Sequence, residues 1–320
     1  MTAALTETAL ITGSTDGIGV TTARNILLGD SDIRKVLIHG RDIDRIRLTT
    51  ASIQKSASAN GNTAVALPAS DLSTIQGCYD LANSVLDCCS NSQSKASASS
   101  EDTPTLTVLM NNAGVYSNKL IHTEDGLELT FAVNVLAPFI ITSMLLSTLL
   151  ESGSRKDGKA NSRIVIASSI SQSWRLAKDY WDDPHCHNRS YSAHSAYSES
   201  KLLDAMLTIE MAQRLEDAGI DHSVLTCNCL DPGTVNTKML LDGWGPIGIK
   251  VQDALDETWC CTSPELNGVS GEYFVGRSRR QASGCAYDSF HRAELWKTLS
   301  ELAPEAAAEW DRAVQAYSSR

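Results

Sequence analysis

The chain has 320 residues, of which 42% are apolar and 20% are charged, an ordinary balance for a globular protein with a buried core. Collagen, a coiled coil and wholesale disorder are therefore excluded. The 38 Asp and Glu residues outnumber the 27 Lys and Arg residues, which gives a formal net charge of −11. A surface of this sign repels phosphate backbones, so no nucleic-acid partner is expected.

The cysteines and the N-terminus both favour a cytoplasmic protein. The nine cysteines are an odd number, and their two adjacent pairs, Cys88/Cys89 and Cys260/Cys261, do not fit the spacing of a secreted disulfide scaffold. The first residues carry neither a basic patch nor an apolar run of signal-peptide length. We expect reduced thiols and a cytoplasmic location.

One stretch, residues 131–150, imitates a membrane span in its length and apolar content. Asn134, Pro138 and several Ser and Thr residues interrupt it, and such polar groups are costly in lipid. The sequence therefore predicts a buried or subunit-contacting helix here and no transmembrane segment.

Short β-branched or apolar runs alternate along the chain with stretches of helical period, which is typical of βαβ units on a parallel sheet. The first two helices are expected from about Ile18 and from about Asp42. A Ser-rich insertion at 90–103 and a polar stretch at 152–162 interrupt the alternation. The strands are expected at 8–12, 36–39, 64–67, 105–110, 163–167 and 223–229.

A glycine-rich segment lies between the first predicted strand and the first predicted helix. Glycines permit a tight turn and a close backbone approach, while the helix N-terminus presents unpaired N–H groups to a pyrophosphate. The spacing here, G-x-x-x-G-x-G, departs from the commoner G-x-G-x-x-G, and an ordinary strand-to-helix turn is the alternative. The candidate cofactor-binding residues of this loop are Gly13, Ser14, Thr15, Gly17, Ile18 and Gly19.

Tyr197 and Lys201 are four residues apart in a predicted helix, so both side chains lie on one face. There the Lys201 ammonium is expected to lower the pKa of the Tyr197 phenol toward neutrality by stabilising the phenolate. A phenol tuned in this way serves as a general acid or base. A solvated helix face is the alternative interpretation.

Further motifs follow the glycine loop in a fixed order: residues 111–114 (NNAG) after the fourth strand, Asn134, Ser168-Ser169 at the end of the fifth strand, and residues 197–201 (YSESK). In these motifs the chain resembles the short-chain dehydrogenases/reductases, over roughly residues 9–303. The resemblance implies a single-domain, three-layer Rossmann-type α/β fold, with the dinucleotide across the carboxyl ends of a doubly wound, mostly parallel sheet. The domain is expected to span 1–320, with a core at about 5–275 and a C-terminal helical extension at about 286–320.

The resemblance also implies roles for the catalytic residues. Tyr197 protonates the carbonyl oxygen while hydride arrives from C4 of the nicotinamide, Ser169 hydrogen-bonds the same oxygen, and Lys201 also holds the ribose hydroxyls. Ser169 is preferred to Ser168 because the second serine of the pair usually occupies this position. Asn134 matches the residue that anchors a water in the proton relay, and a buried Asn that braces the sheet is the alternative.

Arg41 follows the second strand, in the loop that meets the adenosine ribose in this family. A guanidinium binds a 2′-phosphate in a bidentate manner, whereas NAD-binding relatives usually carry an acidic residue there, so NADP(H) is favoured. Asp16 in the glycine loop is not the basic residue of some NADP-dependent relatives, and Asp42 comes one residue late for the NAD role. NAD(H) therefore remains the alternative.

Other segments resemble cofactor-binding parts of the same family. Asp71 and Leu72 match the residues that flank the adenine, with a helix N-cap as the alternative for Asp71. Pro232 and Gly233 begin a turn similar to the one that lies over the nicotinamide, with a generic Pro-Gly turn as the alternative. The remaining candidate cofactor-binding residues are Asn112, Ala113, Gly114, Val235 and Thr237, and Tyr197 and Lys201 serve both the cofactor and the reaction.

Two groups of sequence segments bear on the substrate side of the site. The segment 240–254 follows the cofactor turn and offers Trp244, Pro246, Ile247 and Ile249 as apolar contacts, which favours a hydrophobic aldehyde or ketone. Isolated surface apolar residues are the alternative. Residues 200–202 and 263–274 resemble the subgroup that contains retinol dehydrogenases and WW-domain oxidoreductases.

No metal is expected, because His185, Cys186 and His187, with His194 nearby, lack a second Cys/His cluster at zinc-site spacing. The apolar helix near 127–150 resembles the helix that many relatives use to dimerise, so a homodimer is a further expectation.

The predicted function is NADP(H)-dependent interconversion of a carbonyl and an alcohol. The alternatives are an NAD-dependent alcohol dehydrogenase, another nicotinamide-dependent reaction such as enoyl reduction or epimerisation, and a catalytically silent NADP(H)-binding regulator. A broken catalytic set would indicate the regulator, and the set of Asn134, Ser169, Tyr197 and Lys201 is complete.

Overall fold

A computed structural model describes residues 7–90, 105–155 and 161–319. It contains one eight-stranded sheet in the order β3-β2-β1-β4-β5-β6-β7-β8, in which every pairing is parallel except that of β7 with β8. The predicted doubly wound, mostly parallel sheet is confirmed. The strands are β1 (Glu7–Ile11), β2 (Ile33–Ile38), β3 (Thr63–Ala66), β4 (Thr105–Asn111), β5 (Ser162–Ala167), β6 (Leu225–Asp231), β7 (Tyr273–Val275) and β8 (Ser278–Arg280).

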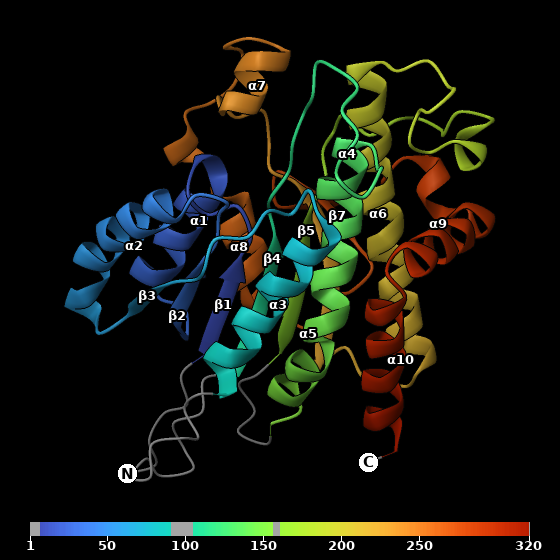
Figure 1. The fold of residues 1–320 in the computed structure, drawn as a ribbon. Helices are drawn as coiled ribbons and strands as arrows, with labels where there is room; N and C mark the ends of the chain where they lie inside the picture. The colour runs from blue at the N-terminus through green and yellow to red at the C-terminus, as the bar shows by residue number, and fades with distance from the viewer. Residues whose placement is uncertain (1–6, 91–104, 156–160, 320) are drawn as a thin grey trace.

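Helices cover both faces of this sheet and give the three layers seen in Figure 1. Side chains alternate between the faces of a strand, so Ile11 of β1 packs in the buried cluster of α1, α2 and α8, whereas Leu10 packs in that of α3, α5 and α6. The helices are α1 (Gly17–Leu28), α2 (Ile43–Ala57), α3 (Ile75–Ser90), α4 (Leu129–Phe131), α5 (Ala137–Gly153), α6 (Ala193–Asp217), α7 (Lys238–Gly243), α8 (Asp256–Thr262), α9 (Ser289–Leu302) and α10 (Pro304–Ser318).

The order of the strands reverses between β1 and β4. The chain first adds β2 and β3 on one side of β1, and then returns to add β4, β5 and β6 on the other side. The loops that leave the carboxyl ends of β1 and β4 therefore run in opposite directions and leave a crevice, which is where ligands bind in open α/β sheets.

The strand and helix ends differ from the predicted ones by at most three residues, the largest difference being at β2, which was expected from 36 and begins at Ile33. The sixth strand, expected at 223–229, is Leu225–Asp231, because Ser223 lies in a turn where its N–H donates to the Asp221 carboxylate at 2.7 Å. The second helix begins at Ile43, and Asp42 is its N-cap.

The long apolar stretch 131–150, predicted as one helix, lies in three consecutive parts: α4, a π-helical segment (Ala132–Leu136) and α5. The π segment precedes Pro138, which has no N–H to donate to the carbonyl four residues earlier. Leu129–Gly153 is long and apolar enough to cross a membrane, because an 18-residue window of it has a mean hydropathy of 2.0. However, 89% of that window is buried inside the protein. Its burial matches that of a core helix.

The region predicted as a C-terminal helical extension forms α9 and α10, which pack against α6 and α5 respectively (Figure 1). The Trp296 ring lies 5.2 Å from that of Phe139 in α5 and 5.0 Å from that of Trp310. Part of the surface of α5 is therefore covered by α10 within the same chain. Dimerisation through α5 stays a prediction. Of the predicted loop insertions, 91–103 and 156–160 lie outside the described residues.

None of the nine cysteines is paired in a disulfide in the structure, and their reduced state in the cell stays a prediction. The adjacent pair Cys260 and Cys261 is buried in α8 and packs in the cluster of α1 and α2. Burial raises the pKa of both thiols well above the ordinary value, so these cysteines behave as small apolar residues.

Candidate active site

A cavity of about 390 Å³ opens at the carboxyl ends of the strands, within the range of roughly 300–1,000 Å³ that small-molecule and cofactor sites occupy. Its walls come from the loops that follow β1 to β6, so segments far apart in the sequence meet there. The predicted residues that line it are Gly13, Thr15, Gly17, Ile18, Arg41, Asp71, Leu72, Asn112, Ala113, Gly114, Tyr197, Lys201, Pro232 and Thr237.

The other predicted residues do not line this cavity. They are Ser14, Gly19, Asn134, Ser169, Gly233 and Val235. The Ser14 hydroxyl is buried and accepts the His39 N–H at 3.0 Å, so it joins the glycine loop to the end of β2. Gly19 lies beneath the same loop, where a Cβ would meet the Gly13 carbonyl oxygen at 2.7 Å. These two residues therefore shape the loop from behind.

The floor of the cavity joins the glycine loop to the loop after β4. Gly13 and Gly17 have φ angles of +65° and +58°, a region that favours glycine. The Asn112 amide donates to the Thr12 carbonyl at 2.6 Å, and the Ala113 N–H donates to the Thr12 hydroxyl at 2.9 Å. The two motifs thus form one hydrogen-bonded surface at the N-terminus of α1.

His39 is a positioning residue that the sequence analysis missed. It is fully buried, and burial lowers its pKa to about 4, so the ring is neutral. Its Nδ1 accepts the Gly13 N–H at 3.0 Å, which leaves Nε2 to donate to the Ser70 carbonyl at 3.2 Å. One ring therefore fixes the glycine loop and the loop after β3 relative to each other.

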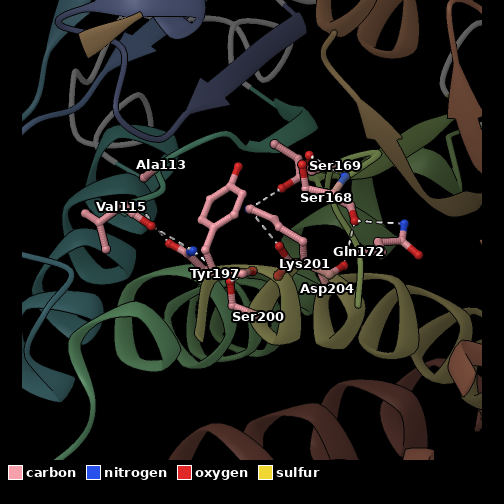
Figure 2. Close-up of polar contacts among 12 residues, drawn as sticks. Ala113, Val115, Ser168, Ser169, Gln172, Tyr197, Ser200, Lys201 and Asp204 are labelled. Atoms are coloured by element: carbon pink, nitrogen blue, oxygen red, sulfur yellow. Dashed lines mark hydrogen bonds and ion pairs between the residues drawn. The ribbon is translucent and has the colours of Figure 1, made fainter. Parts of the chain in front are cut away.

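Tyr197 and Lys201 lie on one face of α6, as predicted, and both line the cavity (Figure 2). The Lys201 ammonium lies 5.7 Å from the centre of the Tyr197 ring. The expected depression of the phenol pKa is not found. Burial raises the pKa of Tyr197 above its ordinary value of 10.0, and the opposing effect of Lys201 is smaller.

The Lys201 ammonium is held from two sides. It donates to the Ala167 carbonyl at the end of β5 at 2.7 Å and to the Asp204 carboxylate, one helical turn on, at 2.8 Å (Figure 2). Asp204 is 0% exposed and Lys201 is 4% exposed, so this is a buried ion pair. Asp204 was not predicted as a site residue.

The two serines at the end of β5 point to different partners. The Ser168 hydroxyl donates to the Lys201 backbone carbonyl at 2.7 Å and accepts from the Gln172 amide at 3.2 Å. The Ser169 hydroxyl accepts the Ser171 N–H at 3.0 Å and lies near enough to the Tyr197 phenol to lower the pKa of that phenol. The structure therefore places the predicted serine beside the phenol, while Ser168 binds the helix backbone.

Asn134 lies in the π segment and is 1% exposed. Its side chain accepts the Val115 N–H at 2.8 Å and donates to the Val115 carbonyl at 3.1 Å and to the Ser200 hydroxyl at 2.9 Å. These contacts join the loop after β4 to α6, and not to a strand of the sheet. The main-chain carbonyl of Asn134 has no helical hydrogen bond from residue 138, because Pro138 has no N–H to donate. The role of Asn134 in anchoring a water stays a prediction.

Two arginines line the cavity beyond the end of β2. Arg41 was predicted and Arg45, in the first turn of α2, was not. Asp16 pairs with Lys238 at 2.6 Å and with Arg45 at 2.9 Å. The Lys238 contact above all lowers the pKa of Asp16 to about 2. The negative charge of Asp16 is therefore balanced by two cations at the mouth of the cavity.

Aromatic rings surround the exposed side of Tyr197. Trp244, at the end of α7, lies 5.5 Å from the Tyr197 ring, 4.8 Å from Tyr116 and 5.1 Å from His194. The Tyr116 hydroxyl lies 3.0 Å from Nδ1 of His194, one helical turn before Tyr197. Of the apolar residues predicted in this loop, Trp244 contacts the site, whereas Ile247 is 68% exposed.

The family profile described as short chain dehydrogenase matches residues 7–178, more than half of the chain. The chain belongs to the short-chain dehydrogenase family. Retinol dehydrogenase 14 of Homo sapiens is 30% identical over 92% of this chain and 85% of its own length. Polyprenol dehydrogenase of Homo sapiens is 29% identical over 92% of this chain and 84% of its own length. The resemblance inferred from the motifs is confirmed.

Solved structures support the same short-chain dehydrogenase fold. The RhlG/NADP active-site complex of Pseudomonas aeruginosa superposes with a TM-score of 0.60 and 19% identity, over 88% of this chain and 96% of that one. At this identity the likeness concerns the fold alone. That the chain is an oxidoreductase follows from its membership of the short-chain dehydrogenase family.

The cavity fits the nicotinamide dinucleotide that this short-chain dehydrogenase fold binds. Gly13, Thr15 and Gly17 line the cavity at the N-terminus of α1, the end of a helix that suits a pyrophosphate. Arg41 and Arg45 offer cationic donors at one end, and Tyr197 and Lys201 line the cavity as well. The donor set suits an anionic cofactor.

Proposed function

We propose that this protein is an NADP(H)-dependent oxidoreductase that interconverts an apolar carbonyl compound and its alcohol. The observation that carries the proposal is that one cavity brings Tyr197 and Lys201 together with the glycine loop and two arginines. A catalytically silent regulator is less well supported, because the Ser169 hydroxyl lies at the phenol and the predicted catalytic set is intact.

The preference for NADP(H) is supported by the charges at the end of β2. Arg41 and Arg45 both line the cavity, and guanidinium groups suit a 2′-phosphate. The carboxylate of Asp42, the candidate for an NAD-type contact, accepts the N–H groups of Asp44 and Arg45 as the α2 N-cap. It is therefore engaged by the helix.

In this proposal the bound nicotinamide supplies the hydride for carbonyl reduction. The Tyr197 phenol donates the proton to the carbonyl oxygen, and the high pKa of a buried phenol keeps that proton on the enzyme until it is needed. The Ser169 hydroxyl, beside the phenol, hydrogen-bonds the same oxygen. Lys201, held at Ala167 and Asp204, has one N–H left to donate to the cofactor ribose.

The apolar substrate is supported by the rings beside the phenol. Trp244 and Tyr116 form an aromatic wall at Tyr197, where a substrate carbonyl must lie. The relatives named above are dehydrogenases of retinol and polyprenol, both apolar alcohols. We therefore propose an apolar aldehyde or ketone and its alcohol as the substrate pair.

The experiment is to follow oxidation of NADPH, and separately of NADH, with a panel of aliphatic, aromatic, retinoid and steroid carbonyls. The Tyr197→Phe variant should lose turnover by about 10²–10⁴-fold, because it lacks the proton donor. Tyr191→Phe is the matched control, since the Tyr191 hydroxyl donates to the Ser117 carbonyl and the residue does not line the cavity. Equal turnover in Tyr197→Phe and the wild type would contradict the proposal, and tight NADPH binding without turnover would favour the regulator.

A further inference from the structure

Lys201, the positively charged neighbour of Tyr197, forms a buried ion pair with Asp204. A lysine ammonium has three N–H donors. Two of them are taken by the Ala167 carbonyl at 2.7 Å and the Asp204 carboxylate at 2.8 Å. The ammonium is therefore fixed against the end of β5, on the same helix face as the phenol (Figure 2).

Asp204 places a carboxylate in a dry environment, where burial raises its pKa to about 6, so the group is ionised above that pH. Its side chain is 0% exposed, and its second oxygen, Oδ1, has no hydrogen-bond partner among the described residues. Burial alone would lower the pKa of Lys201, but Asp204, together with Tyr197 and Glu257, more than offsets this, and the pKa of Lys201 is raised. The lysine thus stays protonated, and the pair as a whole is neutral.

A neutral pair stabilises a nearby phenolate much less than a lone ammonium does. Lys201 favours the phenolate of Tyr197, whereas Asp204 opposes it from the same helix and Asp231 opposes it from the end of β6. Glu257 of α8 acts on Lys201, and Tyr116 and His194 lie on the outer side of the phenol ring. Among these groups, Asp204 is the carboxylate that contacts the ammonium directly.

We propose that Asp204 is a positioning residue that offsets the charge of Lys201 and so keeps Tyr197 in its phenol form, ready to donate a proton to a carbonyl. This inference rests on the proposed function and adds to it the group that decides the protonation state of the catalytic tyrosine. It makes proton donation, the step that carbonyl reduction needs, available up to alkaline pH.

The test is the Asp204→Asn variant, which keeps the shape and an acceptor for the ammonium but removes the charge. The phenolate of Tyr197 is measured by ultraviolet difference absorbance, with Tyr197→Phe as reference for the wild type and the double variant as reference for Asp204→Asn. We expect the Tyr197 titration to move down by about one to two pH units, the order of the shift that removing one nearby unit charge gives in an effective dielectric of about 20.

The same shift should appear in kinetics. The alkaline fall of kcat/KM for carbonyl reduction should begin about one to two pH units lower in Asp204→Asn than in the wild type. Thr208→Val is the matched control, because Thr208 is buried one turn further along α6 and donates to the Asp204 backbone carbonyl without contacting Lys201. Thr208→Val should leave both the Tyr197 titration and the pH profile of kcat/KM unchanged.

Two results would overturn the inference. An unchanged Tyr197 titration in Asp204→Asn would mean that the carboxylate does not act on the phenol, even if activity falls. A shift to higher pH would mean that Lys201 loses its proton once Asp204 is removed, so that Asp204 serves to keep the lysine charged instead. The absorbance titration needs no substrate, so failure to find a carbonyl substrate is distinguishable from failure of this inference.

Discussion

The cofactor side and the outer side of Tyr197 are built in different ways. On the cofactor side, backbone turns at the ends of β1 and β4 are fixed by internal hydrogen bonds such as that from Gly13 to the buried His39 ring. On the outer side, the rings of Tyr116, His194 and Trp244 meet from the loop after β4, the start of α6 and the end of α7. The first arrangement depends on hydrogen bonds to backbone groups, and the second depends on the packing of side-chain rings.

The cofactor side carries the motifs that the family shares, whereas the outer side carries side chains that can differ between members and so determine the substrate. The cofactor side repeats the motifs by which the chain belongs to the short-chain dehydrogenase family. The outer side also carries an exposed apolar residue, Ile247, which is 68% exposed in the loop after α7. Substitutions on the cofactor side should therefore affect stability and cofactor choice, and those on the outer side should affect substrate choice.

The largest expected effect tests how deeply the cofactor side is buried. Glu257 is fully buried, lines the cavity and accepts the Thr22 hydroxyl at 2.9 Å, and burial raises its pKa from 4.5 to about 7. Between these values the folded protein keeps a proton that the unfolded chain has lost. This contribution to the free energy of unfolding is therefore fully present below pH 4.5 and is lost as the pH rises through 7, by about 3 kcal/mol.

Glu257→Gln should remove that pH dependence, because the amide stays neutral throughout. Urea unfolding at about pH 5 and about pH 8 measures it, and the wild type should lose about 3 kcal/mol more than the variant between the two. The exposed Glu265→Gln is the control and should behave as the wild type does. If the wild type and Glu257→Gln showed equal losses, Glu257 would be ionised in the folded protein at both pH values.

A smaller effect is expected where the cofactor side meets the adenosine ribose. Replacing Arg41 or Arg45 with Ala should raise KM for NADPH by roughly 10- to 50-fold and leave KM for NADH within about twofold, since each removes a charge-assisted hydrogen bond to a phosphate. Arg47→Ala is the control, because Arg47 is in the same helix and pairs with Asp44 on the exposed surface. Equal losses with both cofactors would place the arginines at the pyrophosphate instead.

The motifs predicted which residues meet at the cavity on the cofactor side, because these residues follow the ends of strands. Gly13, Gly17 and Asn112 lie where the alternation of strands and helices put them, at the cavity. His39 was missed because only the packed loops show that its ring joins Gly13 to Ser70.

Side chains that act through burial could not be predicted from spacing. Asp204 is three residues after Lys201, so the sequence shows that the two are neighbours, but acidic residues are mostly exposed and nothing local indicates that Asp204 is buried. Glu257 contacts Thr22 across 235 residues. The pKa of Tyr197 was predicted in the wrong direction for the same reason, because spacing reveals the lysine and not the desolvation.

The smallest expected effect tests the outer side. Trp244→Ala removes a ring that contacts Tyr116, His194 and Tyr197, yet leaves Lys201 and the cofactor wall in place. The kcat/KM for bulky apolar carbonyls should fall about five- to tenfold, equivalent to losing about 1 kcal/mol of aromatic contact, while short aliphatic aldehydes change by less than about twofold.

The control for this prediction is Trp174→Ala, which removes the same side chain from an exposed position on the neighbouring loop. If Trp244 forms part of the substrate wall, only Trp244→Ala lowers the ratio of kcat/KM between bulky and short carbonyls, and KM for NADPH stays unchanged in both variants. A fall in kcat/KM that is equal for all carbonyls would show that Trp244 acts through Tyr197, by holding the phenol ring. The outer side would then be an extension of the catalytic machinery, and substrate choice would reside elsewhere on the loops after β5 and β6.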